Sequence, residues 1–243
     1  MAESLGSPHA AGGTLGAGRR NEGLCGSTSP LLWVTLAGLV GFSSAVAFSS
    51  WLKWERSTFV LAHAGVTLSF LAIYVRSAGI RPMTQLRQRW PAGLVVGLLA
   101  GAVLTYGVQQ QAPSTRPLGS ALVGSLAWLG LVYGALDAVL LSVVPVLTVY
   151  GSRPPEALSR AAARIQWGAL SLLASLAVTA SYHLGFAEFR GPNLVQPLIG
   201  NAIVTLAYLL AGNPLAPVLA HVIMHGAAVL HGAASTAQLP PHY

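Results

Sequence analysis

The sequence predicts an all-α protein, a polytopic bundle of about seven membrane-spanning helices. Of its 243 residues, 53% are hydrophobic and only 8% are charged, whereas a soluble domain carries roughly 25% charged residues to coat its surface. The mean hydropathy of +0.62 agrees with this reading. Apolar runs of about 20 residues, the length that crosses the ~30 Å hydrocarbon core of a bilayer, recur along the chain. A lipid bilayer is therefore the expected solvent.

The apolar runs divide the chain into three parts. Residues 1–29 are rich in Gly, Ser and Ala without apolar periodicity, which predicts a disordered tail. Residues 30–233 form the predicted transmembrane domain, and residues 234–243 form a short C-terminal tail. The seven spans are expected near residues 31–50, 57–76, 91–108, 120–144, 165–184, 195–212 and 214–232.

Helix-breaking residues between the apolar runs support this division. Pro154 and Pro155 break the chain after the fourth span, and the pair Asn213 and Pro214 predicts a tight turn between the last two spans. The first run is longer than the ~7–15 apolar residues of a secretory signal, which favours a retained membrane helix. The single cysteine, Cys25, excludes an intrachain disulfide and a cysteine-rich metal site.

The basic residues predict the orientation in the membrane. The net charge of +7 is scattered over short connections rather than gathered in a basic stripe, so a nucleic-acid partner is not expected. Cytoplasmic loops carry the excess of Lys and Arg. We expect the protein in the cell membrane, and this rule places its N-terminus in the cytoplasm and its C-terminus outside. The tail side holds Arg19, Arg20, Arg76, Arg81, Arg87, Arg89, Arg153, Arg160 and Arg164, and the other side holds only Lys53, Arg56, Arg116 and Arg190.

Glycines at a spacing of four residues mark two expected helix contacts. Gly93, Gly97 and Gly101 follow this spacing in the third span, and Gly130 and Gly134 follow it in the fourth. Small residues at this spacing let the backbones of two membrane helices approach closely. Both helices are therefore expected to pack tightly against a neighbour.

One carboxylate lies deep in the predicted fourth span. Asp137 is the only aspartate of the chain, within the run LVYGALDAVLLSVVP, and no Lys or Arg accompanies it in that run. An ionisable side chain at this depth costs at least ~2.5–3.5 kcal/mol on insertion scales. Asp137 is expected to face the bundle and a partner on another helix, or to be protonated and hydrogen-bonded to nearby backbone.

Histidines form the second polar group in the spans. His221 and His225 are four residues apart in the seventh span, so their imidazoles share one helix face and could reach one metal ion or one carboxylate. His183 ends the fifth span. His231 is rotated away from the face of His225, and a lone membrane histidine such as His63 is more often a hydrogen-bonded packing residue than a ligand.

The segments GALDAVLLS, TASYHLGF and NPLAPVLAHVIMHG follow one another in the chain. In order and separation they resemble the motifs of the CAAX protease and bacteriocin-processing (CPBP) family of intramembrane metalloproteases, over about residues 120–232. The family has a paired-glutamate motif EExxxR, then a histidine at the end of the next helix, then HxxxN. The resemblance implies cleavage of a membrane-embedded peptide by metal-activated water. It assigns Asp137 as base or ligand, and His183, His221 and His225 as ligands of a divalent ion, with zinc expected first.

The first motif departs from the family pattern. Leu136 and Asp137 occupy the paired-glutamate positions, Leu141 stands in place of the arginine, and His225 stands in place of the asparagine. If the first glutamate activates the water, this chain lacks that base. Asp137 would have to replace it with a shorter side chain, and a displacement of 1 Å can cost ~100-fold in rate.

Other functions stay open at this point. One is a non-catalytic relative, in which the same residues form a structural polar or metal cluster. Another is a b-type haem protein, in which His63 and a histidine of the seventh span ligate the iron. A transporter would more usually show internal repeats, and the sequence has none that we detect. The substrate and the oligomeric state are not indicated.

Overall fold

The computed structural model describes residues 29–153, 155–232 and 238–240. The predicted disordered tail lies outside the described residues except for Ser29, and so does most of the predicted C-terminal tail. In the part that is described, the regular structure is helical throughout. Seven of the helices are long and apolar enough to cross a membrane. The chain is therefore an all-α polytopic bundle, as predicted.

The seven spans overlap the seven predicted ranges. Three short connecting helices, η4 (Pro155–Leu158), η5 (Ala187–Phe189) and α3 (Pro82–Arg87), lie between spans. The fifth span begins earlier than predicted, at Ala161 rather than residue 165. The spans are Pro30–Trp51 (α1, Pro30–Ser44, with η1, Ala45–Trp51), α2 (Arg56–Ser77), α4 (Trp90–Gln109), Gly119–Val149, α8 (Ala161–Leu184), Pro192–Ala211 (η6, Pro192–Leu194, with α9, Val195–Ala211) and α10 (Leu215–Gly232).

The fourth span continues to Val149, past the end expected at residue 144. Proline normally ends a helix because it has no N–H and leaves the carbonyl four residues earlier without a partner. Here that carbonyl belongs to Leu141, and the hydroxyl of Ser175 on α8 donates to it over 2.6 Å. The turn before Pro145 is also widened to a π-helix, Val139–Val143, and both prolines and π-bulges are sites where helices kink. Apart from this π-helix, the fourth span consists of four segments: α5 (Gly119–Ser125), η2 (Leu126–Tyr133), α6 (Gly134–Ala138) and α7 (Val144–Val149).

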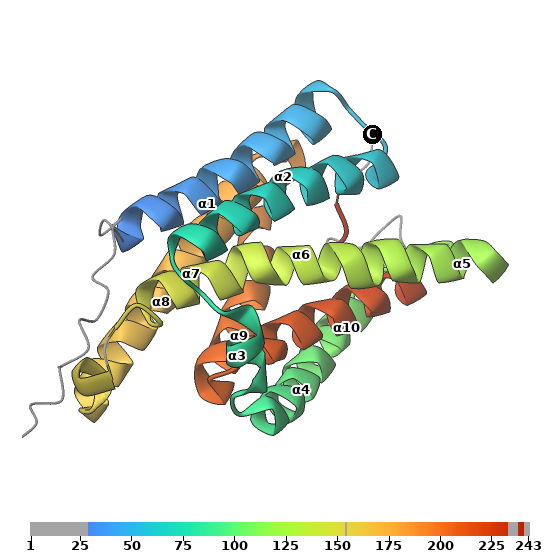
Figure 1. The fold of residues 1–243 in the computed structure, drawn as a ribbon. Helices are drawn as coiled ribbons and strands as arrows, with labels where there is room; N and C mark the ends of the chain where they lie inside the picture. The colour runs from blue at the N-terminus through green and yellow to red at the C-terminus, as the bar shows by residue number, and fades with distance from the viewer. Residues whose placement is uncertain (1–28, 154, 233–237, 241–243) are drawn as a thin grey trace, which may run out of the picture.

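Helix α10 packs against α4 on one side and the fourth span on the other (Figure 1). The predicted glycines make both approaches close. A Cβ on Gly97 would lie 3.0 Å from the carbonyl oxygen of Ala216, and one on Gly130 would lie 3.3 Å from the Cα of Gly226. A Cβ on Gly134 would lie 3.2 Å from the ring of His225. The glycine stripes therefore pack the helices as predicted, and they also make room for a histidine.

Gly97→Leu should destabilise the bundle by about 1–3 kcal/mol, because the added side chain meets backbone atoms of α10 that cannot turn aside. Gly65→Leu on α2 is the matched control, since among the described residues no atom beyond its own stretch of helix lies within 4 Å of a Cβ at that position. Unfolding of the purified variants in detergent measures the difference. Equal midpoints for the two variants would contradict the close contact of α4 and α10.

The last two spans form the predicted hairpin. Gly212 ends α9 in the left-handed region, with φ of 63°. Asn213 then accepts a hydrogen bond at Oδ1 from the backbone N–H of Leu215, over 2.7 Å. Its Nδ2 donates to the carbonyls of Gln85 and Leu86, over 3.2 and 3.0 Å, and also to that of Gln88. This asparagine thus fixes the start of α10 relative to the connection before α4.

Candidate functional site

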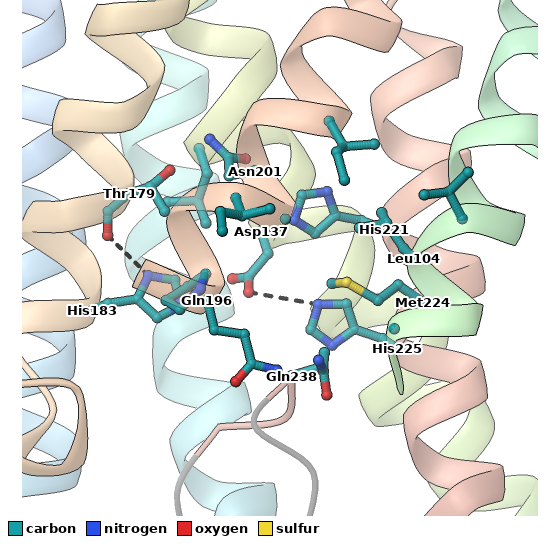
Figure 2. Close-up of a pocket in the computed structure, with 17 residues that line it drawn as sticks. Leu104, Asp137, Thr179, His183, Gln196, Asn201, His221, Met224, His225 and Gln238 are labelled. Carbon is teal, nitrogen blue, oxygen red and sulfur yellow. Dashed lines mark hydrogen bonds and ion pairs between the residues drawn. The ribbon is translucent and has the colours of Figure 1, made fainter. Parts of the chain in front are cut away.

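A cavity of about 180 Å³ lies inside the bundle, among α4, the fourth span, α8, α9 and α10. Its walls include all four residues that the sequence singled out, Asp137, His183, His221 and His225 (Figure 2). The fourth, fifth and seventh spans therefore converge at one cavity that these polar side chains share, as the motifs predict.

Asp137 is 4% exposed, and imidazoles from two different helices face its two oxygens. Oδ1 lies 3.7 Å from Nε2 of His63 on α2, and Oδ2 lies 3.9 Å from Nε2 of His225 on α10. Both distances suit ion pairs and are too long for hydrogen bonds. Since Oδ1 is fully buried, Oδ2 is the oxygen on the cavity side. The partner on another helix that the sequence led us to expect is therefore histidine.

His183 occupies the last turn of α8 and is held by its own helix. Its Nδ1 lies 2.9 Å from the carbonyl oxygen of Thr179. A carbonyl can only accept, so Nδ1 carries a proton, and in the neutral ring Nε2 presents a lone pair. The ring also packs edge-on against Tyr182 and Phe189, with centroids 5.1 and 4.9 Å apart. The cavity extends from Asp137, inside the fourth span, to this helix end, where Gln196 and Gln238 also line it.

His221 and His225 share one face of α10, as their spacing predicts. Their rings are stacked, with centroids 5.8 Å apart and planes 17° apart. Both residues are buried, and Nδ1 of each has no hydrogen-bond partner in the described part of the chain. The rings of His225 and Tyr133 also pack at nearly a right angle, with centroids 5.0 Å apart. The pair lies in a largely apolar wall with unused hydrogen-bonding capacity.

The donor set has the chemistry of a divalent-metal site, but its arrangement does not fit one. A zinc ion takes imidazole nitrogens at about 2.0–2.1 Å, which requires the rings to converge on a single point. The rings of His221 and His225 are instead parallel. Among the described residues, no group of three or more His, Cys, Asp or Glu side chains is placed to hold an ion. Zinc bound by His183, His221 and His225 stays a prediction from the sequence.

The haem alternative also finds no support in this geometry. The pair proposed from sequence was His63 with a histidine of the seventh span. Between His63 and His225 lies the carboxylate of Asp137, which faces both imidazoles. A flat macrocycle would need the space that this carboxylate occupies.

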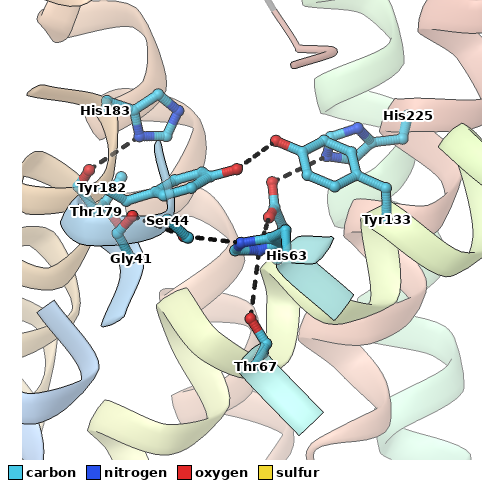
Figure 3. Close-up of polar contacts among 10 residues, drawn as sticks. Gly41, Ser44, His63, Thr67, Tyr133, Thr179, Tyr182, His183 and His225 are labelled. Atoms are coloured by element: carbon cyan, nitrogen blue, oxygen red, sulfur yellow. Dashed lines mark hydrogen bonds and ion pairs between the residues drawn. The ribbon is translucent and has the colours of Figure 1, made fainter. Parts of the chain in front are cut away.

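Sequence reasoning missed several polar residues around the cavity. The hydroxyls of Tyr133 and Tyr182 are 2.7 Å apart, and both tyrosines are buried (Figure 3). Tyr133 precedes Asp137 by four residues, so their shared helix face was a usable signal. For His63 the sequence favoured a packing role and left its function open, because a polar contact with Asp137 depends on how α2 is rotated in the bundle, which periodicity does not show.

A buried hydrogen-bond network fixes the far wall of the cavity. Asn201 on α9 donates to Ser175 and accepts from Ser142, both over 2.8 Å. Thr205 joins the same two hydroxyls, at 2.7 Å from Ser175 and 3.1 Å from Ser142. The network links the fourth, fifth and sixth spans, and Asn201 is the member that lines the cavity. Its amide is engaged in holding helices together.

Fold and site together define a polytopic α-helical membrane protein with a buried carboxylate–imidazole cavity. Comparison with family models, with curated proteins and with solved structures gave no match. The similarity to the CPBP family therefore rests on the sequence motifs alone.

Proposed function

We propose that the chain is an intramembrane hydrolase that cleaves a peptide bond of a membrane-embedded substrate, using water activated at Asp137. The observation that carries the proposal is that one carboxylate and three imidazoles, from three spans, line a single cavity. Groups of these two types are the usual general acids and bases of enzymes. Burying four of them together in a membrane protein also costs stability, which favours a functional reason.

The proposed reaction uses the cavity-side oxygen of Asp137. Oδ2 accepts a proton from a water molecule as the water oxygen adds to the carbonyl carbon of the substrate. The lone pair at Nε2 of His183 accepts the other hydrogen of the water and orients it. The C–N bond then breaks, and the leaving nitrogen takes the proton from Oδ2. The products are a carboxyl group and an amine, and Asp137 returns to its starting state.

The cavity walls support access from the lipid side. Val103 on α4 and Ile199 on α9 both line the cavity, and they are 57% and 58% exposed. An apolar side chain exposed on a membrane span faces acyl chains when the span crosses a bilayer. A substrate segment in the membrane would enter between α4 and α9, while water reaches the cavity at Gln196 and Gln238.

The orientation is part of the proposal. The excess of Lys and Arg on the tail side supports a cytoplasmic N-terminus in the cell membrane, and the Gln196 end of the cavity then lies toward the outer face. In a Cys25→Ser background, Gln88→Cys should react with a membrane-impermeant thiol reagent only after the cells are opened, whereas Thr115→Cys should react in intact cells. The reverse pattern would invert the topology.

The activity is tested with purified protein in liposomes together with membrane proteins of the expression host. New peptide N-termini are counted by mass spectrometry for wild type and for Asp137→Asn. We expect a set of termini inside hydrophobic segments that only the wild type produces. Identical termini from both proteins would remove the hydrolase, and the non-catalytic polar cluster would become the better account.

A further inference from the structure

The connection between the second and third spans presents positive charge and apolar side chains together on its surface. Helix α3 lies in it, between the end of α2 at Ser77 and the start of α4 at Trp90 (Figure 1). Because both neighbouring helices are long and apolar enough to cross a membrane, the connection lies near the surface of the bilayer that they cross. An exposed arginine stands at each end of α3, Arg81 before its first residue and Arg87 as its last residue.

These arginines have no acidic partner in the part of the chain that the structure describes. The ion pairs found there are those of Asp137 with two histidines, so Arg76, Arg81 and Arg87 pair with no carboxylate. The sequence gives the reason, since no Asp or Glu occurs between Glu55 and Asp137. A surface that carries charge of one sign without compensation attracts counter-ions of the other sign. The expected ligand of this surface is therefore an anion.

Apolar side chains are exposed beside the arginines. Met83 is 62% exposed and Leu86 is 37% exposed, and because they are three residues apart they share one face of α3. Trp90 follows at the start of α4 and is 55% exposed. Tryptophan at the end of a span is typical of the boundary between membrane and water, and an apolar helix face flanked by basic residues is typical of helices that lie in this boundary.

The bundle holds the backbone of α3 in place. The carbonyls in the last turn of a helix have no partner within the helix. In α3, the carbonyls of Gln85 and Leu86 accept from Nδ2 of Asn213, which lies in the hairpin between the last two spans. The attachment uses backbone atoms, so the exposed side chains of α3 stay available to a ligand.

A phospholipid fits this surface better than a soluble anion. A nucleic acid or a free phosphate ion would pair with Arg81 and Arg87 and would leave Met83 and Leu86 in water. The lipid carries a phosphate group and acyl chains in one molecule, and the two flanking spans place the connection where such molecules are.

We propose that the connection is a binding surface for anionic phospholipids, in which Arg81 and Arg87 pair with the headgroup while Met83 and Leu86 insert among the acyl chains. The proposal requires the spans to cross a bilayer. It depends neither on which side is cytoplasmic nor on peptide hydrolysis. Each arginine near an anionic membrane surface contributes a factor of about five in affinity, so two arginines predict a preference of about 25-fold for an anionic over a zwitterionic phospholipid.

Native mass spectrometry of the purified full-length protein measures this preference. The protein in detergent is titrated with phosphatidylglycerol or with phosphatidylcholine of the same acyl chains, and the dissociation constant of the first bound lipid is determined. We expect Arg81→Gln/Arg87→Gln to bind phosphatidylglycerol about 25-fold more weakly and phosphatidylcholine as the wild type does. The matched control is Arg116→Gln/Arg190→Gln, which removes the same charge from two exposed arginines at the opposite ends of the spans and should change neither affinity.

A second variant distinguishes a lipid from a soluble anion. Met83→Gln/Leu86→Gln keeps every charge and should also weaken the binding of phosphatidylglycerol, because the acyl chains lose their contact. The inference is overturned if the wild type binds the two lipids equally, or if the two arginine variants lose affinity to the same extent. It is also overturned if Met83→Gln/Leu86→Gln binds as tightly as the wild type while inorganic phosphate or a short oligonucleotide displaces the lipid, since the arginines would then serve a soluble anion.

Discussion

His63→Leu should lower the free energy of unfolding by about 3–5 kcal/mol, the usual cost of removing one partner of a buried ion pair. The loss is large because Asp137 stays behind, 4% exposed, and its one remaining ion-pair partner among the described residues is His225, at 3.9 Å. In His63→Leu the residue left behind is an aspartate, and neutralising an ordinary aspartate at pH 7 costs about 4 kcal/mol. In Asp137→Leu the residue left behind is a histidine, and neutralising an ordinary histidine costs almost nothing. Asp137→Leu should therefore destabilise the bundle less than His63→Leu.

The double variant His63→Leu/Asp137→Leu should recover most of the stability lost in His63→Leu, because no buried charge remains. Unfolding of all four proteins in detergent closes this double-mutant cycle. Two single losses that simply add in the double variant would mean that the two side chains do not interact. His231→Leu, at the far end of α10, gives the cost of removing a histidine that has no carboxylate partner in the described residues.

Asp137→Asn should reduce the rate of peptide cleavage by about 10²–10⁴-fold, the usual contribution of a general base. The substitution keeps the size of the side chain and removes only its capacity to accept a proton, so the folded bundle should persist. His231→Gln should leave the rate unchanged. The measurement is the cleavage rate of a synthetic peptide, chosen from the sites that the wild type cleaves, in proteoliposomes. A rate in Asp137→Asn within threefold of wild type would assign the chemistry elsewhere.

The fold was predictable because the bilayer constrains each span separately. A span has to be apolar and about 20 residues long to cross the hydrocarbon core, so its position is written locally in the sequence. The end of the fourth span was not predictable in this way. Pro145 is accommodated because Ser175, thirty positions later in the chain, donates to the carbonyl of Leu141. A prediction from neighbouring residues in the sequence cannot include that hydroxyl, because it comes from another span.

The candidate site likewise has residues that the sequence could identify and residues that it could not. Asp137, His221 and His225 could be selected because ionisable residues at membrane depth are rare, and they do line one cavity with His183. His63 satisfied the same criterion, but its role depends on the rotation of α2 toward the fourth span. Gln238 was assigned to the C-terminal tail, and it lines the cavity. The parallel rings of His221 and His225 also show that spacing fixes a shared face without fixing convergent nitrogens.

The central claim is that water is activated at Asp137 and consumed in breaking a peptide bond. It is tested most directly by supplying the synthetic substrate peptide to purified protein in liposomes prepared in ¹⁸O-labelled water. The account predicts that the wild type places one ¹⁸O atom in the newly formed carboxyl group, and that Asp137→Asn forms almost none of this product. Labelled product formed equally by both proteins, or cleavage without ¹⁸O in the new carboxyl group, would contradict it.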